Sequence, residues 1–491
     1  MRALGGPYIA ADIARECAGF IVKGDPATVF DAVTTDSRDV RQGDLFVPIR
    51  GTKFDGHHFL IPALEAGARG SLVASDANRE IPQHLASFVL IQVQDTLQAL
   101  STLASAHRMK YPIPLIAVTG SSGKTTVKEM IAAVLRRSHR PLVSQANYNN
   151  RIGLPMTVLN LGPEHTAAVV EAGINLRGEM DELARAAAAQ VAVVTTIGPV
   201  HLEGLGSIEQ VAVEKFKLVK SLPANGVAVV PHGNRYLTPL AREWGGNVLT
   251  FAGAAADVRA ANLSLGRETS FTMHSPWGRA EIELGIRGEH NVSNALAAAA
   301  AALSVGATLD DVVRGLRECL PPALRMEIVR LPGSRALIRD CYNANPQSMR
   351  AALSVLSELD PEAVDGNQPS GTMVKADSYD ARSQDRPKQL MAVLGDMFEL
   401  GPDAASFHEE IGRDAARLGI DRMVLVGGQS HAYARGYLGA GGNSEAITLA
   451  KDNEEAWEAI REELELYGAI LIKGSRKMKM EELADRIAEE S

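Results

Sequence analysis

The 491-residue sequence has few cysteines, and those it has are badly placed for cross-linking. Cys17, Cys319 and Cys341 are far apart and odd in number, so neither a disulfide framework nor a zinc-binding pattern fits them. We therefore expect a reducing compartment, the cytoplasm. The N-terminus also lacks a long apolar core and carries Asp12, which makes it a poor signal peptide.

Long apolar runs and a surplus of positive charge are missing as well. The longest uncharged run, residues 291–309, is mostly alanine and predicts a buried helix rather than a membrane span, so we expect no membrane insertion. The formal net charge of -9 leaves no general basic field for nucleic acid or anionic lipid. Any anion site must therefore be local. A composition of 46% hydrophobic and 22% charged residues is typical of soluble globular proteins.

The order of elements predicts an α/β protein whose length suits two to four domains. Residues 1–108 mix short strands and helices, and two prolines in Tyr111–Pro114 indicate a boundary before a central domain at 109–320. Buried-strand runs then alternate with helical stretches, which predicts a parallel, doubly wound sheet. The expected strands are 115–120, 167–173, 191–198 and 226–231, with helices over 124–137, 178–190 and 291–304.

Two further segments complete this organisation. Residues 257–287 alternate polar and apolar side chains and suggest an antiparallel extension. A second series of strands, at 335–342, 389–397, 422–428 and 468–474, predicts a third domain over 321–491. Within it, residues 361–388 are polar and rich in helix breakers, so we interpret them as a mobile insertion.

The stretch "VTGSSGKTTVKEM", residues 118–130, joins a predicted strand to a predicted helix and has the composition of a phosphate-binding loop. In such a loop, backbone N–H groups surround the phosphate oxygens, lysine neutralises them and a hydroxyl meets magnesium. The full pattern begins with glycine where this chain has Val118, so an ordinary strand–helix turn remains the alternative. The candidate nucleotide-binding residues here are Gly120, Ser121, Ser122, Gly123, Lys124, Thr125 and Thr126.

A phosphate-binding loop alone does not distinguish a switch, a motor, a kinase and a ligase. Glu171 ends a predicted strand. It is either placed to bind a metal ion or is a glutamate at the end of the strand that faces solvent. His201 follows another predicted strand and a Gly-Pro turn. It is either a ligand at the same site or a structural histidine. Lys215 lies on the next predicted helix, where a surface lysine is the plain alternative.

Taken together, the motifs resemble those of the Mur ligases, the ATP-dependent amide-forming enzymes of peptidoglycan synthesis. The similarity runs in order along nearly the whole chain, through "DSRDVRQGDLFVPIRGTKFDGHHF", "AVTGSSGKTTVKEMI", "NYNNRIGLPMTVL", "IGPVHLEGLGSIEQVAVEKFKL", "GEHNVSNALAAAAAA", "RMEI", "DCYNANPQSMRAAL", "LGDMFELG" and "LIKGSRKMKMEEL". The resemblance implies three domains: a first that binds the UDP end of the substrate near Ser37 and Arg38, a central P-loop domain, and a C-terminal Rossmann-like domain.

Within this family, "DCYNANPQSM" and "LGDMFELG" are most similar to the ligase that joins D-alanyl-D-alanine to UDP-N-acetylmuramoyl-tripeptide. The ligase that adds the third residue usually carries an Asn-Pro-Arg clamp, which this sequence lacks. It stays the first alternative. A P-loop ATPase switch and an inactive scaffold are the others. We expect a monomer.

The resemblance also implies a mechanism through an acyl phosphate and a role for each candidate residue. Lys124 holds the terminal phosphates, Thr125 and Glu171 hold one magnesium ion, and His201 binds a second. Lys215 matches the position of a carbamylated lysine that acts as a further metal ligand, with Lys217 as the neighbouring candidate.

The remaining implied contacts come from several parts of the chain. Asn291 and Asn294 match contacts to the base, Arg325 a contact to phosphate and Asp340 a contact to ribose. Asn343 and Asn345 are expected to shape their turn and reach the nucleotide or the dipeptide. Asn147 to Asn150 are expected near the reacting carboxylate of the substrate. The basic residues of the tail either meet an anionic substrate or form a solvated turn; they are Lys473, Arg476, Lys477 and Lys479.

Overall fold

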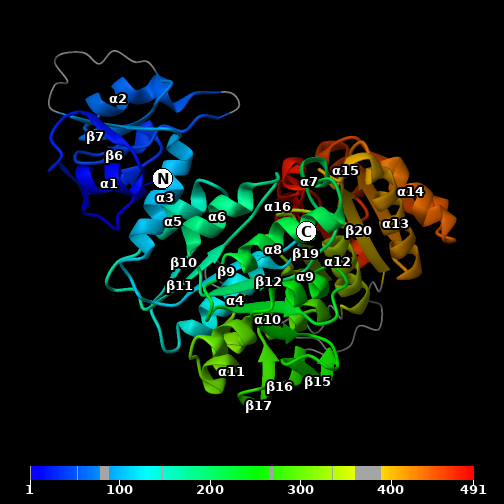
Figure 1. Cartoon of the computed structure of the whole chain (residues 1–491). Helices are drawn as coiled ribbons and strands as arrows, with labels where there is room; N and C mark the ends of the chain where they lie inside the picture. Colours follow the sequence, from blue (N-terminus) through cyan, green and yellow to red (C-terminus); the bar gives the residue numbers. More distant parts are fainter. Residues whose placement is uncertain are drawn as a thin grey trace.

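Three six-stranded sheets follow one another along the chain. The computed structural model describes residues 2–51, 54–77, 88–145, 147–265, 269–333, 335–359 and 389–490. Figure 1 shows the first domain in blue and the third in yellow to red on either side of the central domain. The insertion predicted at 361–388 lies outside the described residues.

The first sheet is mixed, with short strands in the order β1-β5-β6-β7-β8-β3. Its inner pairs β5–β6, β6–β7 and β7–β8 are parallel, and both edge strands are antiparallel to their neighbours. The strands are β1 (Arg2–Ala3), β3 (Phe20–Lys23), β5 (Val33–Thr34), β6 (Leu45–Phe46), β7 (Gly70–Ala74) and β8 (Val89–Val93), beside a small pair β2 (Tyr8–Ile9) and β4 (Val29–Phe30). The helices are α1 (Ala10–Glu16), α2 (Leu60–Glu65) and α3 (Thr96–Arg108).

The central sheet is parallel throughout, in the order β10-β11-β9-β12-β13-β14. Its strands are β9 (Leu115–Thr119), β10 (Pro141–Val143), β11 (Ala167–Glu171), β12 (Val191–Val194), β13 (Val227–Pro231) and β14 (Asn247–Phe251). Its helices are α4 (Lys124–Leu135), α5 (Gly153–Val158), α6 (Glu179–Ala187), α7 (Leu202–Leu205), α8 (Ile208–Lys220), α9 (Leu237–Trp244), α10 (Glu289–Ser304) and α11 (Leu309–Glu318). An antiparallel sheet of β15 (Arg259–Leu265), β16 (Thr269–Ser275) and β17 (Gly278–Leu284) extends it.

Strand β9 shows why this sheet is covered on both faces. Side chains alternate across a strand, and here Leu115 and Ala117 enter one apolar core while Ile116 and Val118 enter another. All four are fully buried. A strand that buries both faces must be apolar without a break, which is the pattern of "LIAV" in the sequence.

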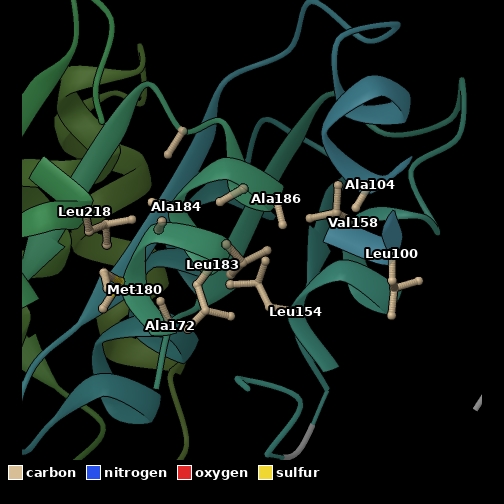
Figure 2. Packing of buried hydrophobic residues seen from close by; sticks show 14 of the residues in the cluster. Leu100, Ala104, Leu154, Val158, Ala172, Met180, Leu183, Ala184, Ala186 and Leu218 are labelled. Carbon is tan, nitrogen blue, oxygen red and sulfur yellow. The ribbon is translucent and has the colours of Figure 1, made fainter. Parts of the chain in front are cut away.

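The core on one face of the central sheet continues into the first domain. Leu100 and Ala104 of α3 share a buried cluster with Leu154 of α5 and Leu183 of α6. Figure 2 shows these side chains as one packed group between the helices. One buried cluster therefore runs from the first domain into the central domain.

The third sheet has the order β18-β19-β23-β20-β21-β22, in which β18 alone is antiparallel. Its strands are β18 (Glu327–Leu331), β19 (Arg335–Arg339), β20 (Gln389–Gly395), β21 (Arg422–Val426), β22 (Ile447–Ala450) and β23 (Tyr467–Lys473). Its helices are α12 (Pro346–Glu358), α13 (Ala404–Arg417), α14 (Ser430–Gly439), α15 (Asn453–Ile460) and α16 (Met480–Glu490). Two clusters of its own, one on each face, form its core.

The sequence prediction of a parallel sheet with an antiparallel extension is confirmed, and each strand predicted in the second and third domains is present. Strands β10 and β14, at the two edges of the central sheet, were not predicted. The alanine-rich segment forms α10, whose residues from Ala295 to Leu303 are buried. Among the described residues, no helix has both the length and the apolarity to cross a membrane.

Candidate functional site

The loop between β9 and α4 has the geometry of an anion-binding turn. Gly120 and Gly123 have φ of 150° and 80°, values that favour glycine. A Cβ at Gly120 would lie 1.9 Å from Oγ1 of Thr195. The loop leads directly into the N-terminus of α4, whose unpaired N–H groups favour a bound phosphate.

The same loop is anchored to the neighbouring strand. The Ser121 N–H donates to the carbonyl of Thr196 at 2.8 Å, and the Ser122 N–H donates to Oγ1 of Thr196 at 3.0 Å. Lys124 Nζ donates back to the carbonyl of Gly120 at 3.0 Å. The loop is thus held in shape by the protein itself, which is preorganisation for a ligand.

Glu171 ends β11, the strand beside β9, and meets the first turn of α4. Its Oε2 accepts a hydrogen bond from Oγ1 of Thr125 at 2.7 Å, and its Oε1 accepts one from Nδ2 of Asn149 at 2.7 Å. The Glu171 residue is 2% exposed. Asn149 belongs to the "NYNN" run, Asn147 to Asn150, that the sequence predicts near the substrate.

His201 and Lys215 approach the site from the segment after β12. His201 precedes α7 with φ of 51°, and its Nδ1 contacts the carboxylate of Glu399 from the third domain. Lys215 lies on the buried face of α8 and is 1% exposed. The plain alternative, that Lys215 is a surface lysine, is therefore wrong.

Burial lowers the pKa of Lys215 well below the usual lysine range, and the nearby ammonium of Lys124 acts in the same direction. The carboxylates of Glu171 and Glu214 oppose this shift of the Lys215 pKa without cancelling it. Burial also lowers the pKa of Lys124 itself, against the opposing effect of Glu171 and with the help of the Arg325 cation. A buried lysine with a lowered pKa is available as a neutral amine.

Lys217, the neighbouring candidate, has a different environment. Its Nζ is 2.7 Å from Oδ2 of Asp181 and also pairs with Glu214. The hydrogen bond to Asp181 raises the pKa of Lys217. Lys217 is therefore held as a cation, which favours Lys215 as the reactive amine.

The two asparagines of α10 lie against the phosphate-binding loop. Asn294 Nδ2 donates to Oδ1 of Asn291 at 2.9 Å, and Asn291 Nδ2 donates to the carbonyl of Arg287 at 2.6 Å. A Cβ added at Gly123 would come within 2.5 Å of Asn294 Oδ1. Both asparagines are buried and line the same cavity as the loop.

The third domain contributes a second group of polar side chains. Asp340 Oδ2 accepts from Nζ of Lys473 at 2.6 Å, and the same Nζ donates to the carbonyl of Asn343 at 2.9 Å. Lys473 is 1% exposed, so it is not part of a solvated turn. The Arg325 guanidinium lies over the ring of Tyr342, 4.0 Å from its centroid.

Direct hydrogen bonds join the two halves of the site. Asn345 caps α12 through the Ser348 N–H at 2.9 Å and donates to the carbonyl of Ser121 at 3.4 Å. Gln347 donates to the carbonyl of Ile197 at 3.1 Å. The N-terminus of α12 is thus docked on the phosphate-binding loop and the segment after β12.

Most of these groups line one cavity of about 610 Å³ between the central and third domains, and Gly120 and Lys215 are not among its lining residues. The cavity is lined by the candidate residues Ser121, Ser122, Gly123, Lys124, Thr125, Thr126, Asn147, Asn149, Asn150, Glu171, His201, Asn291, Asn294, Arg325, Asp340, Asn343, Asn345 and Lys473. Ser37 and Arg38 are instead in a 3-10 turn of the first domain, where Arg38 pairs with Asp36 at 2.7 Å. Arg476, Lys477 and Lys479 are exposed.

The donor set at this site fits a hard cation. Carboxylate and hydroxyl oxygens converge at Glu171 and Thr125, as magnesium prefers. Among the described residues, no group of three or more His, Cys, Asp and Glu side chains forms a metal cluster. Any ion here would therefore be completed by phosphate oxygens, by water or by a modified lysine.

Family models match three successive parts of the chain. They are described as Mur ligase family, catalytic domain, over residues 29–108; Mur ligase middle domain, over 118–302; and Mur ligase, glutamate ligase domain, over 373–476.

Known proteins match over almost the whole length. This chain is 36% identical to the UDP-N-acetylmuramoyl-tripeptide--D-alanyl-D-alanine ligase of Escherichia coli (strain K12) and 34% identical to that of Bacillus subtilis (strain 168). Both matches cover 94% of this chain and 94% of the relative. The crystal structure of MurF from Acinetobacter baumannii superposes with a TM-score of 0.86 at 30% identity, covering 99% of this chain and 100% of that one. MurF from Thermotoga maritima in complex with ADP shares the fold, with a TM-score of 0.77 at 23% identity over 93% of this chain and 97% of that one. With a three-domain fold, an assembled phosphate-loop site and relatives of this identity and coverage, the chain belongs to the Mur ligase family.

Proposed function

We propose that the protein is an ATP-dependent ligase that joins D-alanyl-D-alanine to UDP-N-acetylmuramoyl-tripeptide. The observation that carries this proposal is the single cavity in which the phosphate-binding loop, Glu171 and His201 meet Asp340 and Arg325 of another domain. A simple nucleotide switch does not need this composite arrangement. The relatives reported above bear the name of that activity.

The proposed division of labour follows the domains, with boundaries after residues 108 and 320. The first domain binds the UDP end through the turn of Ser37 and Arg38. The central domain binds the phosphates of ATP, and the third closes the nucleotide site with Asp340 at the ribose and Asn343 nearby. Asn291 and Asn294 face the base. The protein works as a monomer in the cytoplasm.

In the first step, a carboxylate oxygen of the tripeptide attacks the γ-phosphorus of ATP. The bond from that phosphorus to the β,γ-bridging oxygen breaks, ADP leaves and an acyl phosphate forms. Two anions must approach each other, so their repulsion has to be screened by fixed cations and N–H donors. Lys124, the N–H groups at the start of α4 and Arg325 would supply this screening. Asn147 and Asn150 line the same cavity and would contact the substrate near its reacting carboxylate.

Magnesium, when bound, neutralises phosphate charge and polarises the γ-phosphoryl group. Thr125 and Glu171 would hold one ion and His201 a second. Lys215 is buried, and its lowered pKa makes a neutral amine available for reaction with CO2. The amine nitrogen would bond to the carbon of CO2 and lose one proton. The product, a carbamate, would be an anionic oxygen ligand, whereas an ammonium group cannot bind a cation.

In the second step, the amine of D-alanyl-D-alanine attacks the carbonyl carbon of the acyl phosphate. The tetrahedral intermediate loses a proton from nitrogen, its carbon–oxygen bond to phosphate breaks, and the amide and inorganic phosphate are released. Water has to be kept from the acyl phosphate during this step, because its hydrolysis would waste ATP.

Phosphate release with ATP, magnesium and UDP-N-acetylmuramoyl-tripeptide tests the proposal, with D-alanyl-D-alanine added, omitted or replaced by single amino acids. We expect release that requires the dipeptide and is lost in Lys124→Ala. Release with a diamino acid on the shorter precursor would reassign the chain to the ligase that adds the third residue. Release with ATP alone would indicate a switch.

A further inference from the structure

Glu399 is the one acidic side chain of the third domain that contacts His201 in the described structure. It follows β20 in the segment "GDMFELG", and its carboxylate contacts Nδ1 of His201. Its own backbone carbonyl accepts the N–H of Leu202 at 2.8 Å. Glu399 therefore holds the His201 segment at two points, across 198 positions of sequence.

The turn that presents Glu399 is itself fixed by its surroundings. Glu399 has φ of 64°, a left-handed conformation that is unfavourable for a residue with a side chain. The preceding N–H groups are both engaged: that of Met397 donates to Nε2 of His408 at 2.9 Å, and that of Phe398 to Oγ of Ser475 at 2.9 Å. Unfavourable backbone conformations that persist in this way cluster at functional sites.

The chemistry of the contact determines the state of the imidazole. An ionised carboxylate can only accept hydrogen bonds, so Nδ1 of His201 carries the proton. In the neutral ring, Nε2 then keeps its lone pair, and the His201 side chain lines the nucleotide cavity. A carboxylate on the far nitrogen also raises the basicity of a metal-binding histidine.

We propose that Glu399 is a positioning residue: from the third domain it orients His201 and fixes the tautomer whose Nε2 can bind a metal ion. The site is then complete only when the third domain is docked on the central one. This inference rests on the proposed function, because it assumes that His201 is a metal ligand. It adds a residue that contacts neither nucleotide nor metal.

Manganese binding measures this role without turnover. Free Mn²⁺ is followed by electron paramagnetic resonance in the presence of a non-hydrolysable ATP analogue, for wild type, Glu399→Gln and His201→Ala. Removing a residue that hydrogen-bonds to a metal ligand weakens metal binding about 10-fold or more. We expect a loss of Mn²⁺ affinity of this size for Glu399→Gln. Glu203→Gln is the matched control, since Glu203 is an exposed carboxylate two residues from His201, and it should bind Mn²⁺ as wild type does.

A spectroscopic readout separates positioning from simple loss of folding. In protein labelled with ¹⁵N-histidine, we expect His201 to show a protonated Nδ1 and an unprotonated Nε2, and Glu399→Gln to show a mixture of tautomers. The His201→Ala spectrum assigns the signal, and unchanged spectra of the other histidines show that the variant is folded.

The outcomes distinguish this inference from the proposed function. If Glu399→Gln binds Mn²⁺ like wild type while His201→Ala is weakened, Glu399 has no positioning role and the ligase proposal is untouched. If His201→Ala also binds normally, the metal role of His201 fails and the inference falls with it. A protonated Nε2 in wild type would overturn the inference directly.

Discussion

Replacing Lys473 by methionine should destabilise the third domain and weaken nucleotide binding together. Methionine has a similar length and no charge, so the main change is the loss of the ammonium that lies 2.6 Å from Oδ2 of Asp340. The Asp340 side chain is only 12% exposed and would remain as a buried carboxylate without its cation. Removing one partner of a buried ion pair costs about 3–5 kcal/mol.

That cost can be converted into a shift in melting temperature. For a domain of roughly 150–250 residues, each kcal/mol lowers Tm by about 2–4 °C. The lower end of the energy range suits Asp340, which keeps some contact with water, so we expect a shift of roughly 6–12 °C. Trp457, on α15 and 2% exposed, reports this transition by fluorescence if the other two tryptophans are replaced, in Trp244→Phe and Trp277→Phe.

The double variant supplies the control. Asp340→Asn removes the anion but leaves Lys473 two backbone carbonyls to donate to, those of Asp340 and Asn343. Combined with Lys473→Met, it should cost less than the sum of the single changes, because neither charge is then stranded. The ADP dissociation constant, from calorimetry, should rise in both single variants, since Asp340 is the proposed ribose contact. A Tm lowered by less than about 2 °C in Lys473→Met, or strictly additive effects, would refute the reasoning.

Three further predictions concern the loop, the metal site and the cysteines. Glu171→Gln keeps the shape of the side chain but removes its charge, so the rate of phosphate release should fall about 100-fold or more while the melting temperature stays unchanged. A rate near that of wild type would show that Glu171 holds no metal. Gly123→Ala places a Cβ 2.5 Å from Asn294 Oδ1 at a φ of 80°. A strain of about 1–2 kcal/mol should raise the ADP dissociation constant measured by calorimetry about 5- to 30-fold, and an unchanged constant would contradict this. Burial raises the pKa of Cys17, Cys319 and Cys341 to about 12, so alkylation by iodoacetamide at pH 8, followed by mass spectrometry, should be about 10³-fold slower than in urea. Fast labelling of Cys319 or Cys341 in the native protein would contradict their burial.

The part of the fold that the sequence predicted best is determined locally. The apolar strand Leu115–Thr119 is followed within a few residues by Gly120, Gly123 and the start of α4. The apolar run and the glycine turn are therefore enough to predict this part from the sequence. Strand β10 was missed because it is three residues long and begins with Pro141. Strand β14 was missed because, up to Phe251, its residues are only half-buried or exposed and form no apolar run.

Site residues that belong to a local sequence motif could be predicted. Contacts between segments that are far apart in the sequence could not. Lys473 stands in a basic stretch that resembles a solvated turn, and its burial follows from the place of β23 between β19 and β20. Its partner Asp340 is 133 positions away. The contact of Glu399 with His201 spans an even longer separation, and no local pattern encodes such pairs.

The continuous core beneath α3, α5 and α6 has a consequence for how the molecule opens (Figure 2). Because Leu100 and Leu183 belong to one buried cluster, the backbone amide hydrogens of the first two domains should exchange with solvent as one cooperative unit. The third domain has separate clusters and is held to them mainly by polar contacts of α12 and the turn at Glu399. It can therefore detach while still folded, so that a protease cutting the connecting segment would release two intact bodies rather than three.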